Sequence, residues 1–186
     1  MKPKFLTNKE LDILHRYPVE ARRLARHLLA VEGSIFTLSL DYTGGLGLID
    51  RLLERGGPWG YGDVKRIIND DNFPVTGSGI VPVRFRLLRG YDLARHDNQV
   101  YFDDLDARFK DERLRRPNAV EALLVPAEDR QIGREHPMLI PIQGASNTWF
   151  YVYEDVDVGR CLGANGEDGE RSCTFGLEVY FLGVCE

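Results

Sequence analysis

The sequence has few cysteines and no long hydrophobic run, and both deficits limit what the protein can be. Three cysteines in 186 residues are an odd number, which excludes a complete disulfide framework. No stretch is apolar and long enough to span a membrane. The first ten residues contain no apolar core of signal-peptide length. We therefore expect a protein that makes no membrane contact and that is cytoplasmic if its source is bacterial.

Familiar catalytic and cofactor motifs are also missing. The four histidines are scattered, and no Cys-x-x-Cys or His-x-x-x-His pair is present, so we expect no structural zinc site. Phosphate-binding glycine motifs, the Gly-x-Ser-x-Gly elbow and the His-Glu-x-x-His helix are likewise missing. These absences predict neither a metal nor a cofactor, and they favour a protein that is not an enzyme without deciding the question.

An excess of positive charge is missing too. Lysine and arginine total 24 against 29 acidic residues, a formal net charge of -5. Such a balance disfavours nucleic-acid binding driven by overall charge, because phosphates attract positive surfaces. What is present is an ordinary globular composition, with 43% hydrophobic and 28% charged residues. A chain of this length can bury a core, and we expect a single domain over residues 1–186.

Helical patterns come first in the chain and strand patterns come late. Residues 1–33 predict a helical segment that ends at Gly33, and residues 34–186 predict a mixed core. The order favours an α+β fold in which N-terminal helices pack on one face of a mostly antiparallel sheet concentrated in the C-terminal half. The expected strands cover residues 34–42, 81–88, 99–102, 119–125, 138–142, 147–154 and 173–184. The expected later helices cover residues 46–55, 63–69 and 103–116.

A glycine-rich acidic segment, residues 163–170, lies between two predicted strands near the C-terminus. Cys161 and Cys173 border it, and they would either close the loop by a disulfide or remain free thiols, as a reducing compartment favours. The spacing of a calcium-binding loop is absent. The carboxylates of the segment are candidate contacts for a basic partner: Glu167, Asp168 and Glu170.

Two aromatic residues, Trp59 and Tyr61, interrupt the glycine-rich stretch 56–63. Exposed aromatic rings often dominate the energy of an interface, so the pair are candidate binding anchors. The alternative is that they fold back onto the core as a lid, and the sequence does not separate the two.

An acidic run beside a histidine is the best candidate for catalysis. Carboxylates three positions apart share a helix face, so Asp103 and Asp106 could hold a divalent ion, with His96 nearby and Glu121 as a further partner. The competing interpretation is that the same carboxylates favour the positive end of a helix.

A basic helix near the N-terminus carries Arg22, Arg23 and Arg26. It could contact nucleic acid, although such a run is usually a solvated helix face.

Three functional hypotheses follow. The leading one is a soluble, non-catalytic protein-binding module, such as an inhibitor, an immunity protein or an accessory regulatory protein, whose partner is another protein with basic groups. The rival is a metal-dependent hydrolase built on His96, Asp103, Asp106 and Glu121. The third is a nucleic-acid accessory protein that uses the arginine-rich helix.

Overall fold

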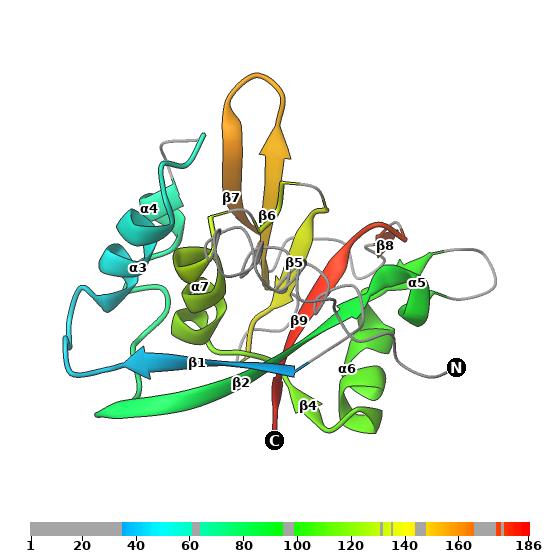
Figure 1. The fold of residues 1–186 in the computed structure, drawn as a ribbon, viewed down its shortest axis with the longest axis horizontal. Coiled ribbons are helices and arrows are strands. Elements are labelled where there is room, and N and C mark those ends of the chain that lie inside the picture. Colours follow the sequence, from blue (N-terminus) through cyan, green and yellow to red (C-terminus); the bar gives the residue numbers. More distant parts are fainter. Residues whose placement is uncertain are drawn as a thin grey trace, which may run out of the picture. The chain divides into compact units, whose positions relative to one another are not determined.

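The computed structural model describes residues 35–60, 64–94, 99–130, 132–134, 136–143, 148–165, 174–175 and 177–186. The predicted α+β fold is confirmed in this part of the chain (Figure 1). The helices are α3 (Leu48–Gly56), α4 (Val64–Ile67), α5 (Gly90–Leu93), α6 (Phe102–Asp111) and α7 (Ala119–Glu128). The strands are β1 (Ile35–Asp41), β2 (Ile80–Arg89), β3 (Val100–Tyr101), β4 (Leu114–Arg115), β5 (Met138–Pro141), β6 (Trp149–Asp155), β7 (Gly159–Asn165), β8 (Thr174–Phe175) and β9 (Tyr180–Cys185). The helical segment predicted for residues 1–33 lies outside the described residues.

The main sheet is mostly antiparallel, as predicted, and it has seven strands in the part of the chain that the structure describes. Its order is β1-β2-β9-β5-β6-β7, with β4 beside β9. Only the neighbours β5 and β9 run parallel among the pairs in this sheet that the structure describes. Strands β3 and β8 form a separate two-stranded sheet. Strand β9 pairs with β2, β4 and β5, so it occupies the centre of the main sheet.

The strands predicted over residues 34–42 and 81–88 are present as β1 and β2, and buried and exposed residues alternate along them. Phe36 of β1 lies opposite Phe85 of β2, and their rings stack with centroids 5.6 Å apart. Phe85 is fully buried, whereas Arg84 beside it is exposed. Successive residues of a strand point to opposite faces, so β1 and β2 share one apolar face and one polar face.

Helices lie on both faces of the sheet, so the prediction of a single covered face is wrong. On one face, α6 places Phe109 in a buried cluster with Leu139 of β5 and Phe181 of β9. The sequence gives α6 few apolar residues, and those few are enough to cover the centre of this face.

The other face carries α3 and α7. Arg160 of β7 reaches the carboxyl ends of both helices with its guanidinium group. Arg160 lies opposite Glu154, whereas Leu139 lies opposite Tyr151. Positions 151 and 154 of β6 point to opposite faces of the sheet, so α7 and α6 lie on opposite sides of it.

The strand predicted over residues 119–125 is wrong, because these residues begin helix α7. Every residue from Ala119 to Ala127 is buried, so the segment shows no polar face from which a helical period could be detected. The helix starts with a capping box, in which the side chains of Asn118 and Glu121 each accept a hydrogen bond from the backbone of the other.

Other elements also differ from the predictions. The strand expected over residues 173–184 is divided into β8 and β9, which belong to different sheets. The helix expected over residues 103–116 ends at Asp111, and Arg113, with a φ of 54°, turns the chain into β4. Strand β7 was not predicted, because its glycines and Arg160 interrupt the alternation typical of strands. Across the described ranges, no helix has the length and apolarity needed to cross a bilayer.

Replacing Gly133 by alanine is expected to lower the free energy of unfolding by about 2–4 kcal/mol. Gly133 has a φ of 90°, and a Cβ there would lie 2.7 Å from Val152 Cγ1 and 2.9 Å from the Val152 carbonyl oxygen. Gly159 is the matched control, since its φ is 82° but no atom lies within 4 Å of its Cβ position. Urea unfolding should show a loss of only about 1 kcal/mol for Gly159→Ala. Equal losses for the two variants would contradict the crowding at Gly133.

Candidate functional site

Trp59 folds back onto the protein, which is the second of the two arrangements open from the sequence. Its indole Nε1 donates a 2.8 Å hydrogen bond to the Leu53 carbonyl oxygen at the end of α3. The Arg160 guanidinium lies over the ring, 4.7 Å from its centroid. A half-buried ring whose N–H is already bonded within the chain is poorly placed to anchor a partner.

Most of the other predicted site residues are not placed by the structure. These residues lie outside the described part of the chain: Arg22, Arg23, Arg26, Tyr61, His96, Glu167, Asp168, Glu170 and Cys173. The side chain of Asp103 also lies outside it.

The remaining carboxylates of the hydrolase hypothesis are each held by an arginine. Asp106 accepts two hydrogen bonds from Arg116, at 2.7 and 2.8 Å. Glu121 accepts two from Arg115, both at 2.7 Å. Paired hydrogen bonds of this kind are among the strongest that a carboxylate makes, so each of the two groups is already neutralised by an arginine of the same chain.

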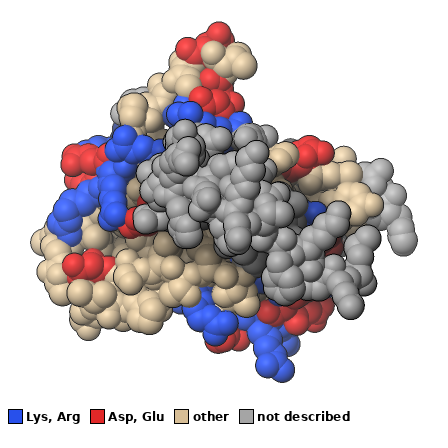
Figure 2. Space-filling model, in the orientation of Figure 1, with Lys and Arg blue, Asp and Glu red and all other residues tan. Residues whose placement is uncertain are grey.

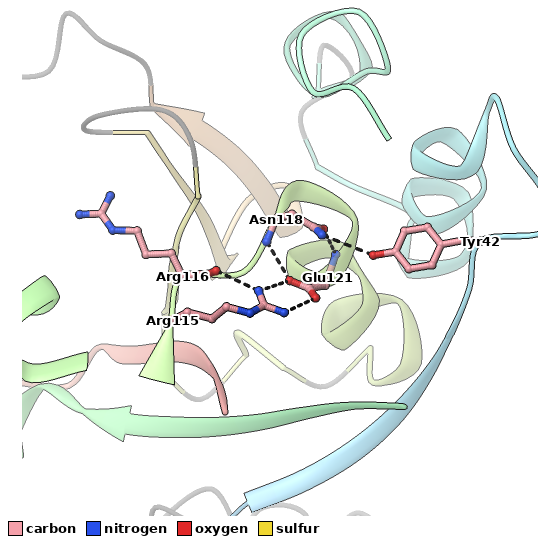
Figure 3. A network of polar contacts seen from close by, with 5 residues as sticks. All are labelled: Tyr42, Arg115, Arg116, Asn118 and Glu121. Carbon is pink, nitrogen blue, oxygen red and sulfur yellow. Dashed lines mark hydrogen bonds and ion pairs between the residues drawn. The ribbon is translucent and has the colours of Figure 1, made fainter. Parts of the chain in front are cut away.

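The two arginines are neighbours, yet they hold helices on opposite sides of the sheet. Arg115 and Arg116 diverge, and the Arg116 side chain points away from the Glu121 network (Figure 3). Arg115 reaches Glu121 on α7 and Arg116 reaches Asp106 on α6. The fold therefore does not bring Asp106 and Glu121 together. No group of three or more histidine, cysteine or acidic side chains within metal-binding reach occurs among the residues that the structure places.

Glu121 is instead the centre of a polar network at the start of α7 (Figure 3). One Glu121 oxygen also accepts the Asn118 backbone N–H at 2.9 Å, and the Asn118 side chain donates to the Tyr42 hydroxyl at 3.3 Å. Burial raises the pKa of Tyr42, and the two hydrogen bonds to Glu121 raise the pKa of Arg115. The network joins the end of β1, β4 and α7, and its hydrogen bonds serve the fold.

Arg160 is the most deeply buried cation of the described residues, with 6% of its surface exposed. It donates to four backbone carbonyls: Gly56 at 2.7 Å, Ile132 at 3.0 Å, and Pro126 and Asp129 at 3.2 Å each. Burial lowers the pKa of Arg160 to about 10, so it remains charged at neutral pH. The carboxyl ends of α3 and α7 carry partial negative charge, which compensates the buried guanidinium.

Cys161 is a free, buried thiol in β7, opposite Tyr153 of β6. Its Sγ donates to the Gly159 carbonyl oxygen at 3.3 Å, and burial raises the pKa of the thiol. A thiol with a raised pKa holds little of the reactive thiolate at neutral pH.

The β6–β7 hairpin ends in a feature that the sequence analysis missed. Its turn exposes 98% of Val156 and 44% of Val158. The Asp155 carboxylate accepts hydrogen bonds from the backbone N–H groups of Asp157, at 2.9 Å, and Val158, at 3.2 Å. The sequence Asp-Val-Asp-Val-Gly, residues 155–159, carries a turn signature that could have located this feature.

The hairpin end combines apolar and acidic groups on one projecting element. Figure 1 shows the hairpin extending past the neighbouring ends of α4 and α7. Figure 2 shows acidic atoms at the end of the molecule to which the hairpin extends in Figure 1. In the sequence, Asp155 and Asp157 stand on either side of Val156.

Comparison of the chain with known protein families, curated proteins and solved structures gave no match.

Proposed function

We propose that this protein is a non-catalytic module that binds another protein, and that the end of the β6–β7 hairpin is its contact surface. The observation that supports the proposal most directly is the 98% exposure of Val156 at the tip of a hairpin. An aliphatic side chain in that position keeps its full hydration cost until a partner covers it.

The turn is held in shape before binding. The two backbone N–H groups bonded to Asp155 fix the path of the chain on either side of Asp157. A contact loop that is already ordered loses less conformational entropy when it binds. More of the free energy gained from the buried area therefore remains as binding affinity.

The charge of the hairpin end defines the partner chemistry. Asp155 and Asp157 stand on either side of Val156, whereas Glu154 is 3.5 Å from Arg134 in an ion pair within the chain. Complementary charge steers association and rejects wrong partners. The partner is therefore a protein with an apolar pocket bordered by lysine or arginine.

The change Val156→Asp is expected to weaken partner binding about tenfold or more. It replaces the side chain that enters the partner's pocket by a charge. Leu46→Asp is the matched control, because Leu46 is also highly exposed, at 90%, and lies outside the hairpin. The assay is affinity capture from the source cells, followed by a titration of the recovered protein against the two variants.

The proposal requires one recovered protein that binds the wild type and Leu46→Asp alike and Val156→Asp weakly. Equal binding to all three would move the contact surface elsewhere and overturn the hairpin assignment. Recovery of no protein would overturn the binding function itself.

A further inference from the structure

We propose that two copies of this chain associate through β1, with the two strands antiparallel and related by a two-fold axis at Leu38. In the described part of the main sheet, β1 is an outermost strand and pairs with β2 alone. The copies would thus join their sheets into one continuous sheet. This association is independent of the binding function proposed for the hairpin.

The backbone groups that face outward are set by the pairing with β2. The Tyr42 N–H donates to the Gly79 carbonyl oxygen at 2.8 Å, on the inner side of β1. Hydrogen-bonding direction alternates along an antiparallel strand, so positions 36, 38 and 40 also bond inward. The outward N–H and C=O groups therefore belong to Ile35, Thr37, Ser39 and Asp41.

This outward set is self-complementary. An axis at Leu38 places Thr37 opposite Ser39 of the other copy, and Ile35 opposite Asp41 of the other copy. Opposed outward residues in antiparallel strands exchange both of their backbone hydrogen bonds. Every outward N–H and C=O of β1 finds a partner in this register, which is the isologous arrangement typical of two-fold dimers.

The side chains fit the same register. Phe36, Leu38 and Leu40 lie on one face of β1, opposite apolar residues of β2. In the paired strands they meet Leu40, Leu38 and Phe36 of the other copy on that same face. Thr37 and Ser39, both exposed, meet on the other face. β1 contains neither the lysine nor the proline with which edge strands usually block such pairing.

Charge favours the antiparallel register as well. Asp41 is the only charged residue of β1, and the pairing separates the two copies of Asp41 to opposite ends. Each lies opposite Ile35 of the other copy, which pairs with Arg86 of β2. The exposed Arg84 lies on the same face of β2, so at each end of the joined sheet an acidic and a basic side chain share one face, two strands apart.

Sedimentation equilibrium over a range of concentrations tests the dimer and its register together. The wild type is expected to dimerise. The double variant Thr37→Lys/Ser39→Lys sets like charges opposite each other and is expected to raise the dissociation constant about tenfold or more. The double variant Thr37→Lys/Ser39→Glu sets opposite charges together and is expected to retain the dimer. Both positions are exposed, and circular dichroism checks that each variant is folded.

Oxidation of a Leu38→Cys variant gives a second readout. The axis brings the two copies of position 38 into a non-hydrogen-bonded pair, with Cα atoms about 4.5 Å apart, within the range of a disulfide. A covalent dimer is expected for Leu38→Cys. Neither the wild type nor Thr37→Cys should form one, because the two copies of position 37 are offset along the strands.

A wild type that stays monomeric at every concentration would overturn the proposal. Equal dissociation of the two double variants would overturn it as well.

Discussion

Replacing Arg160 by methionine is expected to lower the free energy of unfolding by about 3–5 kcal/mol. The reason is the set of four carbonyl oxygens that its guanidinium binds: Gly56, Pro126, Asp129 and Ile132. A buried acceptor that loses its donor keeps the whole cost of its lost hydration. Methionine fills much of the space but donates nothing, so the carboxyl ends of α3 and α7 lose the group that joins them to β7.

The control for this prediction is Arg130→Met. Arg130 donates one hydrogen bond, at 3.0 Å, to the Arg55 carbonyl oxygen at the surface, and its loss should cost about 0.5–1.5 kcal/mol. Arg160→Lys is informative too, because an ammonium group cannot reproduce the planar set of guanidinium donors. Denaturant unfolding monitored by Trp fluorescence measures all three. If Arg160→Met and Arg130→Met lost the same stability, Arg160 would not hold the two helix ends.

Replacing Glu121 by alanine is expected to cost about 3 kcal/mol of unfolding free energy. Only 6% of the Glu121 side chain is exposed, and its oxygens bind Arg115 and the Asn118 backbone N–H. The change removes half of the capping box and leaves Arg115 without its carboxylate. Glu121→Gln should cost less, since glutamine can still accept the Asn118 N–H as part of a capping box.

A double-mutant cycle separates the ion pair from the cap. The double variant Arg115→Met/Glu121→Gln lacks both charges. Its loss of unfolding free energy is therefore expected to be smaller than the sum of the losses of Arg115→Met and Glu121→Gln. The difference measures the coupling between Arg115 and Glu121. Additive losses would mean that the two side chains act independently, contrary to the 2.7 Å contacts between them.

The parts of the fold that the sequence predicted are those in which one face is buried and the other is solvated. Strand β2 is the clearest case, because Val83 and Phe85 are buried and Arg84 between them is exposed. The prediction for α7 was wrong for the opposite reason. This helix is buried on all sides, so its sequence lacks the contrast between apolar and polar residues from which a helical period is detected. The start of α7 could nevertheless have been predicted, because Asn118 and Glu121 have the spacing of a capping box.

The candidate sites were harder to predict than the fold. Asp106 and Glu121 suggested a shared metal site, but Arg115 at the end of β4 and Arg116 directly after it pair with helices on opposite sides of the sheet. Sequence proximity does not show which face of a sheet a helix covers. The exposure of Val156 was not predicted, because one valine in a sequence does not show whether its side chain is buried. Only the structure of the turn around Val156 shows that this residue lies at a hairpin tip.

The central position of β9 has a consequence for how the chain folds during synthesis. This strand is made after every other strand of the main sheet, yet it joins β2 on one side to β5 and β4 on the other. Among the strands that the structure describes, only β9 links the β1–β2 ribbon to the β5–β6–β7 portion, so this link must wait until residues 180–185 have left the ribosome. Assembly of the sheet must then wait for contacts between distant parts of the chain, which is the slow step in folds dominated by non-local pairing. Until β9 is made, the nascent chain therefore exposes strand edges, the state in which chaperones protect proteins from aggregation.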